Sequence, residues 1–263
     1  MTALHGLGVL LRQQGDLDGS RAALERCLDY WTRIGNRAQV AAELSSLAAV
    51  HRARGDNDLA RTMLADGIAA AREAGDRACL ANGLSNLAML DLDQRPEAAV
   101  ALLHEALDLD RELGDPWGIA CDHTNLAHAM YRAGGVADAY RHLSENAAAA
   151  VALGDIELTV AVLELFCMLL AESADSARTA RPLGATRSMR AEAELPIADP
   201  DAVALQRAVD KVRLQTDADL WQRDLVLGAG YSVEDALAET LNAPVRLSGS
   251  TRVAGGSGIE ERK

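Results

Sequence analysis

A two-residue phrase, leucine followed by a small residue, recurs along the first half of the chain at a spacing of about 40 residues. A fixed period of this size is the signature of a stacked repeat protein, in which each unit packs on its neighbours. Such proteins usually bind other chains along an extended surface and rarely catalyse reactions. The four copies of the phrase are Leu7-Gly8, Leu47-Ala48, Leu87-Ala88 and Leu126-Ala127.

Glycine followed by Asp or Asn marks the breaks inside and between these repeats. A glycine after a helix can adopt the left-handed conformation that ends it, and the next Asp or Asn can accept hydrogen bonds from the first amides of the following helix. The third copy lacks this pair and has Gln94-Arg95-Pro96, so its turn must be built differently. The regular breaks are Gly15-Asp16, Gly35-Asn36, Gly55-Asp56, Gly75-Asp76, Gly114-Asp115 and Gly154-Asp155.

Short turns of this kind predict consecutive helices that pack antiparallel. Small residues recur in the second helix of each repeat and would let the paired helices approach closely, while leucines fill the space beside them. The predicted helices cover residues 2–14, 17–34, 37–54, 57–74, 77–93, 97–113, 116–133, 136–153 and 156–173.

This pattern resembles the tetratricopeptide repeat (TPR), as in "LAAVHRARGDNDLARTMLADGIAAAREAGD" and "LGVLLRQQGDLDGSRAALERCLDYWTRIGN". The period is 40 residues rather than the usual 34, which lengthens both helices. The resemblance implies an all-α, right-handed TPR-like α-solenoid of about five helix pairs, followed by a helical C-terminal cap.

The pattern loosens after Asp155. Residues 156–193 read as a fifth helix pair, whose second helix starts near Pro182 or kinks there, because proline removes a helical hydrogen bond. A loop at 195–202, helices at about 200–215 and 217–227, and a last helix after Ser232 follow, with Asp235 completing a capping box. We therefore expect TPR-like repeats over 1–193, a helical cap over 194–243 and a flexible tail over 244–263.

The C-terminal third also resembles the end of actinobacterial ATPase regulators of the LuxR-type and adenylate-cyclase-linked classes. The segments that carry this resemblance are "ARPLGATRSMRAEAELPI" and "DPDAVALQRAVDKVRLQTDADLWQRDLVLGAGYSVEDALAETL". Pro182 departs from the family's Arg-Leu-Leu-Gly-Ala phrase, and no phosphate-binding GxxxxGK[ST] loop occurs. The resemblance implies a sensor or arm portion of a bacterial signalling or transcription-regulatory system.

The net charge of −13 argues against nucleic acid as a partner, because phosphate contacts need a basic patch. No secretory signal or membrane span is recognisable, and the four cysteines form no CxxC pair. We expect them to be buried free thiols, as in a reducing cytoplasm.

The first helices of TPR pairs line the concave face of the solenoid, which is where we expect a protein or peptide partner. Asn amides at recurring positions could bind a peptide backbone as donor and acceptor; the alternative is that they are ordinary residues of a polar inner face. The candidate partner-binding residues are His5, Arg12, Ser45, Arg52, Asn82, Ser85, Asn86, Thr124, Asn125, His128 and Tyr131.

Catalytic, cofactor and metal sites are not predicted. His123 and His128 are five residues apart and do not converge on one helix face, so with Asp122 they form no metal site. Trp31, Trp117 and Trp221 are expected to pack between helices.

The sequence therefore favours a non-enzymatic protein- or peptide-interaction module. The alternative is a transcription regulator that acts on DNA as part of a larger ATPase or LuxR-type assembly. A hydrolase or transferase lacks any converging nucleophile, base or metal set.

Overall fold

A computed structural model describes residues 1–195 and 199–242, which form thirteen α-helices and no strand. The predicted tail at 244–263 lies outside the described residues. The helices are α1 (Thr2–Gln13), α2 (Leu17–Arg33), α3 (Arg37–Arg54), α4 (Asn57–Ala74), α5 (Arg77–Asp91), α6 (Pro96–Leu113), α7 (Pro116–Arg132), α8 (Val136–Ala152), α9 (Ile156–Ala171), α10 (Ser176–Glu192), α11 (Asp199–Arg213), α12 (Ala218–Ala229) and α13 (Val233–Leu241).

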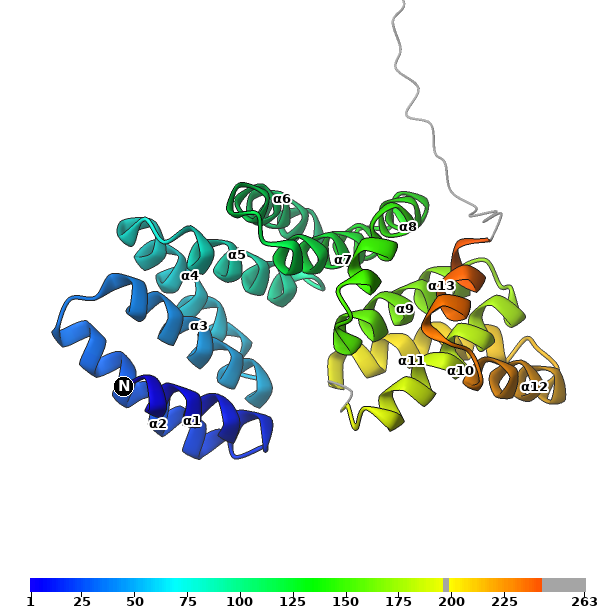
Figure 1. The fold of residues 1–263 in the computed structure, drawn as a ribbon, viewed down its shortest axis with the longest axis horizontal. Coiled ribbons are helices and arrows are strands. Elements are labelled where there is room, and N and C mark those ends of the chain that lie inside the picture. The colour runs from blue at the N-terminus through cyan, green and yellow to red at the C-terminus, as the bar shows by residue number, and fades with distance from the viewer. Residues whose placement is uncertain (196–198, 243–263) are drawn as a thin grey trace, which may run out of the picture.

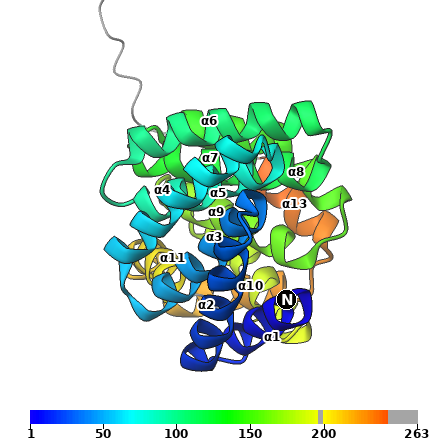
Figure 2. The same ribbon diagram turned by 90° about the vertical axis from the view of Figure 1, so that its left-hand side faces the viewer.

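The helices form a curved row of pairs that ends in a compact group, α9 to α13 (Figure 1). Consecutive helices from α1 to α10 pack against each other, and the first helices α1, α3, α5, α7 and α9 also contact one another. The corresponding contacts among α2, α4, α6 and α8 are weak or missing within the described residues. Because closer spacing on one side curves a stack toward that side, the first helices line the inner side of the row. Figure 2 shows the same stack from its N-terminal side. The predicted all-α solenoid of about five helix pairs is confirmed.

The predicted stop-and-start chemistry sets the helix ends. Gly55 has φ +84°, and the glycines of the other five regular breaks also have positive φ, so they supply the left-handed residue that ends each helix. Asp76 illustrates the following cap, because its carboxylate accepts a hydrogen bond of 3.0 Å from the Cys79 amide. Asp56 is the exception and caps no amide with its side chain.

Small residues explain how closely the paired helices approach. A Cβ added at Gly8 would lie 2.8 Å from the Leu24 side chain, closer than any real contact. This proximity lets the Ser20 hydroxyl donate to the Gly8 carbonyl at 2.7 Å. Leu24 of the first repeat packs with Leu47 and Val50 of the second, and all three are almost fully buried. The leucine of one repeat therefore forms part of the core that it shares with the next.

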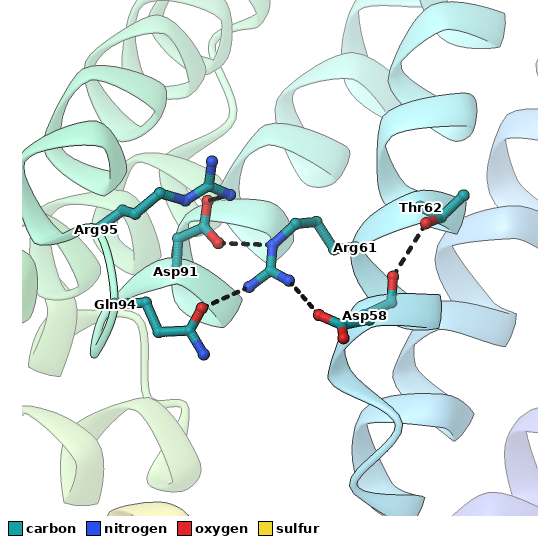
Figure 3. A network of polar contacts seen from close by, with 6 residues as sticks. All are labelled: Asp58, Arg61, Thr62, Asp91, Gln94 and Arg95. Carbon is teal, nitrogen blue, oxygen red and sulfur yellow. Dashed lines mark hydrogen bonds and ion pairs between the residues drawn. The ribbon is translucent and has the colours of Figure 1, made fainter.

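The irregular third turn is built on a buried carboxylate (Figure 3). Asp91, which is 2% exposed, accepts hydrogen bonds from Arg61 at 3.1 Å and from Arg95 at 2.6 Å. Arg61 also donates to Asp58 and Gln94, which ties α4 to the end of α5. Pro96 then starts α6, where its missing N–H costs nothing. The expectation of a different turn is confirmed.

The fifth pair departs from one expectation. Helix α10 begins at Ser176, six residues before Pro182, so of the two predicted alternatives the start near Pro182 is wrong, and the helix continues through the proline. Asp175 caps this helix through the Arg178 amide, and Pro182 lies inside it, where it is buried. A strong N-terminal cap and tertiary burial outweigh the loss of one helical hydrogen bond.

The last three helices pack on the fifth pair. Helix α12 crosses α10 closely, because a Cβ at Gly184 would lie 2.2 Å from the Leu225 carbonyl oxygen and one at Gly228 only 1.9 Å from that of Arg181. Helix α11 begins at Asp199, so the end of the predicted 195–202 loop is helical. The predicted capping box of Ser232 and Asp235 starts α13.

Helix α11 covers α9 on one side through a cluster of apolar residues. Leu205, Val209 and Val212 pack in one buried group with Cys167 and Met168 of α9. Together with α7, α8, α10 and α13, this coverage buries most of α9.

The aromatic and sulfur side chains follow the predictions in part. Trp221 is buried and Trp31 packs beside a core cluster, but Trp117 is 51% exposed, which contradicts its expected place between helices. Its indole Nε1–H donates to Asp155 at 3.0 Å, so the ring lies along the helix-turn edge instead. All four cysteines are free; Cys27 and Cys167 are buried and the other two half-buried. Among the described helices none is both long and apolar enough for a membrane span.

Candidate binding groove

A groove of about 520 Å³ opens on the inner side of the first three repeats. It crosses the first helices α1, α3 and α5, which supply its lining together with Leu24 of α2. We call it the inner groove, and its lining residues are His5, Val9, Arg12, Leu24, Ala42, Ser45, Ser46, Ala49, Arg52, Ala78, Cys79, Asn82 and Asn86. The structure thus brings together six of the eleven predicted partner-binding residues: His5, Arg12, Ser45, Arg52, Asn82 and Asn86.

Two asparagines form the polar end of the inner groove on α5. The Asn86 amide nitrogen donates to the Asn82 side-chain oxygen at 2.9 Å, and both residues are exposed. This bond leaves the Asn86 oxygen as an acceptor and further N–H groups as donors. The pair can therefore satisfy both the N–H and the C=O of a peptide backbone.

His5 separates the groove from a buried acid. The imidazole Nδ1 of His5 lies 3.0 Å from Glu43 Oε2, and Glu43 is only 1% exposed. A buried carboxylate needs such a partner, because an isolated buried charge is costly. The histidine side chain, itself about one third exposed, therefore lies between this carboxylate and the groove.

The remaining predicted residues lie beyond the inner groove. Ser85 donates a short hydrogen bond to Asp122 of α7, and Thr124 is buried with its hydroxyl donating to the Ala120 carbonyl at 2.9 Å. Tyr131 donates to Glu172 at 3.0 Å. Asn125 and His128 are half-buried on α7. These five residues were expected on one continuous face with the others, but the groove does not include them.

Buried titratable groups gather around α7. Burial, opposed by the Ser85 hydrogen bond and reinforced by the charges of Asp110 and Asp115, raises the pKa of Asp122 to about 7. Its second oxygen, Oδ2, has no hydrogen-bond partner in the described structure. Because the Asp122 side chain is buried, its carboxyl group is not accessible to a ligand.

A second pair of titratable groups joins α7 to α8. His123 Nδ1 lies 2.9 Å from His142 Nε2. Burial and the neighbouring imidazole lower the pKa of His123 to about 4, and burial also lowers the pKa of His142. The two rings are therefore neutral at pH 7 and share one hydrogen bond.

Sequence reasoning missed several of these groups because their partners lie on other helices, about one repeat away for Glu43 and Asp122 and half a repeat away for His142. Glu43, Asp122 and His142 were not proposed, and no local motif surrounds them. The repeat register offers one signal, because Glu43 and Asp122 occupy equivalent positions in their repeats and each contacts the preceding first helix. Within residues 1–195 and 199–242, no group of three or more His, Cys, Asp or Glu side chains is arranged to hold a metal ion.

Comparisons with known proteins agree with this architecture. The family model described as "Tetratricopeptide repeat" matches residues 1–73. The structure defines a TPR-like α-solenoid, and repeats of this type indicate a protein–protein interaction module. No curated protein matches the sequence.

Solved structures with the same fold include three of different origin. A Podosopora anserina putative kinesin light chain with nearly identical TPR-like repeats has a TM-score of 0.57 at 16% identity, over 74% of this chain and 96% of its own. A Rap protein complexed with Competence and Sporulation Factor has a TM-score of 0.58 at 14% identity, over 90% and 75%. BtubC (BKLC) from P. vanneervenii has a TM-score of 0.56 at 18% identity, over 94% and 99%. At these identities the likeness shows the fold alone.

Proposed function

We propose that the inner groove binds a peptide, or an extended segment of a partner protein, and that the chain is a non-enzymatic interaction module. The observation that carries this proposal is the groove itself, which is lined by polar side chains from three successive repeats. Its volume of about 520 Å³ lies within the range of ligand-binding clefts. The Rap structure in complex with its factor supports the idea that this fold can hold such a ligand.

The ligand would lie across α1, α3 and α5, with its backbone over Asn82 and Asn86. Half-buried Ala49 lines the groove on α3, the middle one of the three helices, and a large side chain there would obstruct it. The asparagine pair leaves acceptor and donor groups exposed, and hydrogen bonds to a peptide backbone are independent of its sequence. Affinity would then come from hydrogen bonds to the peptide backbone, and preference for particular peptide side chains from the other groove residues.

A random peptide library displayed on phage, selected on the full chain, tests the proposal. Fluorescence polarisation then gives the dissociation constant of each selected peptide. We expect Ala49→Trp to abolish binding and Asn86→Ala to weaken it about tenfold, because two backbone hydrogen bonds are lost.

Asn125→Ala is the matched control, since Asn125 occupies the equivalent position on α7 but lies outside the groove. Peptides that bind the wild type, Ala49→Trp and Asn86→Ala with equal affinity would refute the proposal. Weakening by Asn125→Ala as large as that by Asn86→Ala would place the ligand on a longer face than the groove.

We also propose that the partner belongs to a bacterial signalling or transcription-regulatory system in the cytoplasm. The resemblance of the C-terminal third to ATPase regulators supports this context. Direct action on DNA is the less favoured alternative, because the net charge of −13 opposes phosphate binding. Specific retardation of DNA by the chain alone in a mobility-shift assay at low salt would reverse this preference.

A further inference from the structure

Nearly every arginine of the eight repeat helices α1 to α8 has a carboxylate partner. Most of these ion pairs link neighbouring helices or successive turns, as Arg54 does with Asp18 at 2.8 Å and Arg72 with Glu105 at 2.8 Å. The arginines of α1 to α8 without an ion pair to any described residue are Arg12, Arg26 and Arg52; all the others are paired.

Two of these three unpaired arginines line the inner groove. Arg12 of α1 and Arg52 of α3 occupy equivalent positions in the first two repeats, whereas Arg26 lies on α2 outside the groove. The equivalent residue in the third repeat, Leu92, is buried, so the cationic positions stop at the second repeat. The positive charge is therefore confined to the α1–α3 end of the groove.

The lining of the groove contains no acidic side chain. This is unusual for a chain with 39 acidic and 26 basic residues. The buried acid Glu43 contacts the groove residue His5, whose imidazole lies 3.0 Å from its carboxylate. Two guanidinium groups consequently line a hollow to which no carboxylate contributes, and a hollow lined by charge of one sign attracts ligands of the opposite sign.

We propose that the inner groove selects an acidic peptide, whose carboxylates contact Arg12 and Arg52 while its backbone continues over the asparagine pair of α5. This inference rests on the proposed peptide-binding function. Guanidinium groups bind carboxylates through charge-assisted, often bidentate hydrogen bonds, which gives geometric preference as well as affinity. Two carboxylates of one peptide would engage both arginines at once if their separation in space matches that between equivalent positions of adjacent repeats.

A nucleic-acid strand is the other polyanion to consider. Single-stranded nucleic acid is usually held by a continuous basic track together with aromatic side chains on which bases stack. The groove lining has two arginines and no Phe, Tyr or Trp. Its chemistry therefore favours carboxylates on a peptide.

The peptides selected from the random library provide the probe. We expect them to be enriched in Asp and Glu, and to lose affinity about tenfold in Arg12→Gln and in Arg52→Gln, since each substitution removes one charge-assisted contact. Arg26→Gln is the matched control, because it removes an equally unpaired arginine outside the groove and should leave affinity unchanged. Selection on Arg52→Glu should shift the enrichment from acidic toward basic residues.

The outcomes separate this inference from the function on which it rests. Peptides that depend on Asn86 but show no acidic enrichment, or bind Arg12→Gln and Arg52→Gln as well as the wild type, would overturn the acidic preference alone. Binding unaffected by Ala49→Trp and Asn86→Ala would overturn the groove as a site altogether. Displacement of the acidic peptides by equimolar oligothymidine would identify the groove as a polyanion site for nucleic acid and overturn the peptide preference.

Discussion

The contact between α10 and α12 predicts that one added methyl group will destabilise the C-terminal cap. In Gly228→Ala the new Cβ would lie 1.9 Å from the Arg181 carbonyl oxygen and 2.6 Å from the Arg181 Cα. Both atoms belong to the backbone, so no side-chain rotation can relieve the overlap. To reach an ordinary contact of 3.4 Å, the two helices would have to separate by about 1.5 Å.

The expected loss follows from two opposing effects. Overpacking usually costs about 1–3 kcal/mol, and we take about 3–4 kcal/mol here because rigid backbone must move. Replacing glycine by alanine inside a helix returns about 1 kcal/mol. We therefore expect Gly228→Ala to lower the free energy of unfolding of the cap by about 2–3 kcal/mol. Gly6→Ala in α1 is the matched control, because nothing lies within 4 Å of its added Cβ, and it should stabilise by about 0.5–1 kcal/mol.

Urea unfolding can report on the cap separately from the repeats. Trp221 lies on α12 and is buried, so a Trp31→Phe/Trp117→Phe background leaves its fluorescence as a local probe. Circular dichroism at 222 nm follows all helices in parallel. A Gly228→Ala midpoint equal to or above that of the background protein would refute the close-packing argument, as would a loss in Gly6→Ala of the same size.

Three further predictions concern buried polar groups and are measured by chemical unfolding. Asp91→Ala should destabilise by about 2–3 kcal/mol, because it leaves Arg61 and Arg95 without their shared partner; a loss below 0.5 kcal/mol would contradict this. Asp122→Asn should be neutral near pH 4 and stabilise by roughly 2–4 kcal/mol above pH 8, since the folded-state pKa of about 7 lies above the ordinary 3.8 and stability is lost as the carboxyl ionises. The wild type should lose up to roughly 3 kcal/mol of stability as pH falls from 6.5 to 4, because His123 takes up a proton more readily in the unfolded state than in the folded one. His123→Gln should remove this loss; identical pH profiles in wild type and variant would refute it.

Local chemistry made most of the fold predictable. Glycine with Asp or Asn fixes a helix end within two residues, so the observed bounds follow the predicted ones closely from α1 to α9. Pro182 shows where this reasoning fails. A proline reads as a helix boundary when only neighbours in sequence are considered, yet α10 passes through it because Asp175 caps the helix and the residue is buried.

The candidate site was predictable only in its first half. A repeat register places residues on the inner face, and the groove includes the predicted residues of α1 and α3 and two of the three predicted on α5. Predicted residues outside the groove take part in contacts between repeats instead: Ser85 of α5 donates to Asp122 of α7, and Tyr131 of α7 donates to Glu172 of the fifth pair. Partners 37 and 41 residues apart depend on the rotation between helices, which no single repeat encodes.

The uneven burial of the two ends of the solenoid determines where ligand binding would change amide hydrogen exchange. Helix α9 packs against five other helices, whereas α1 packs against α2 and touches α3 only lightly. Amide hydrogens should therefore exchange fastest in the first repeat and slowest around α9. The inner groove lies in the N-terminal half, so a ligand that bridges α1, α3 and α5 would join three helices that otherwise contact one another only lightly. Binding would slow amide exchange in the N-terminal helices and would leave exchange in the C-terminal helices almost unchanged.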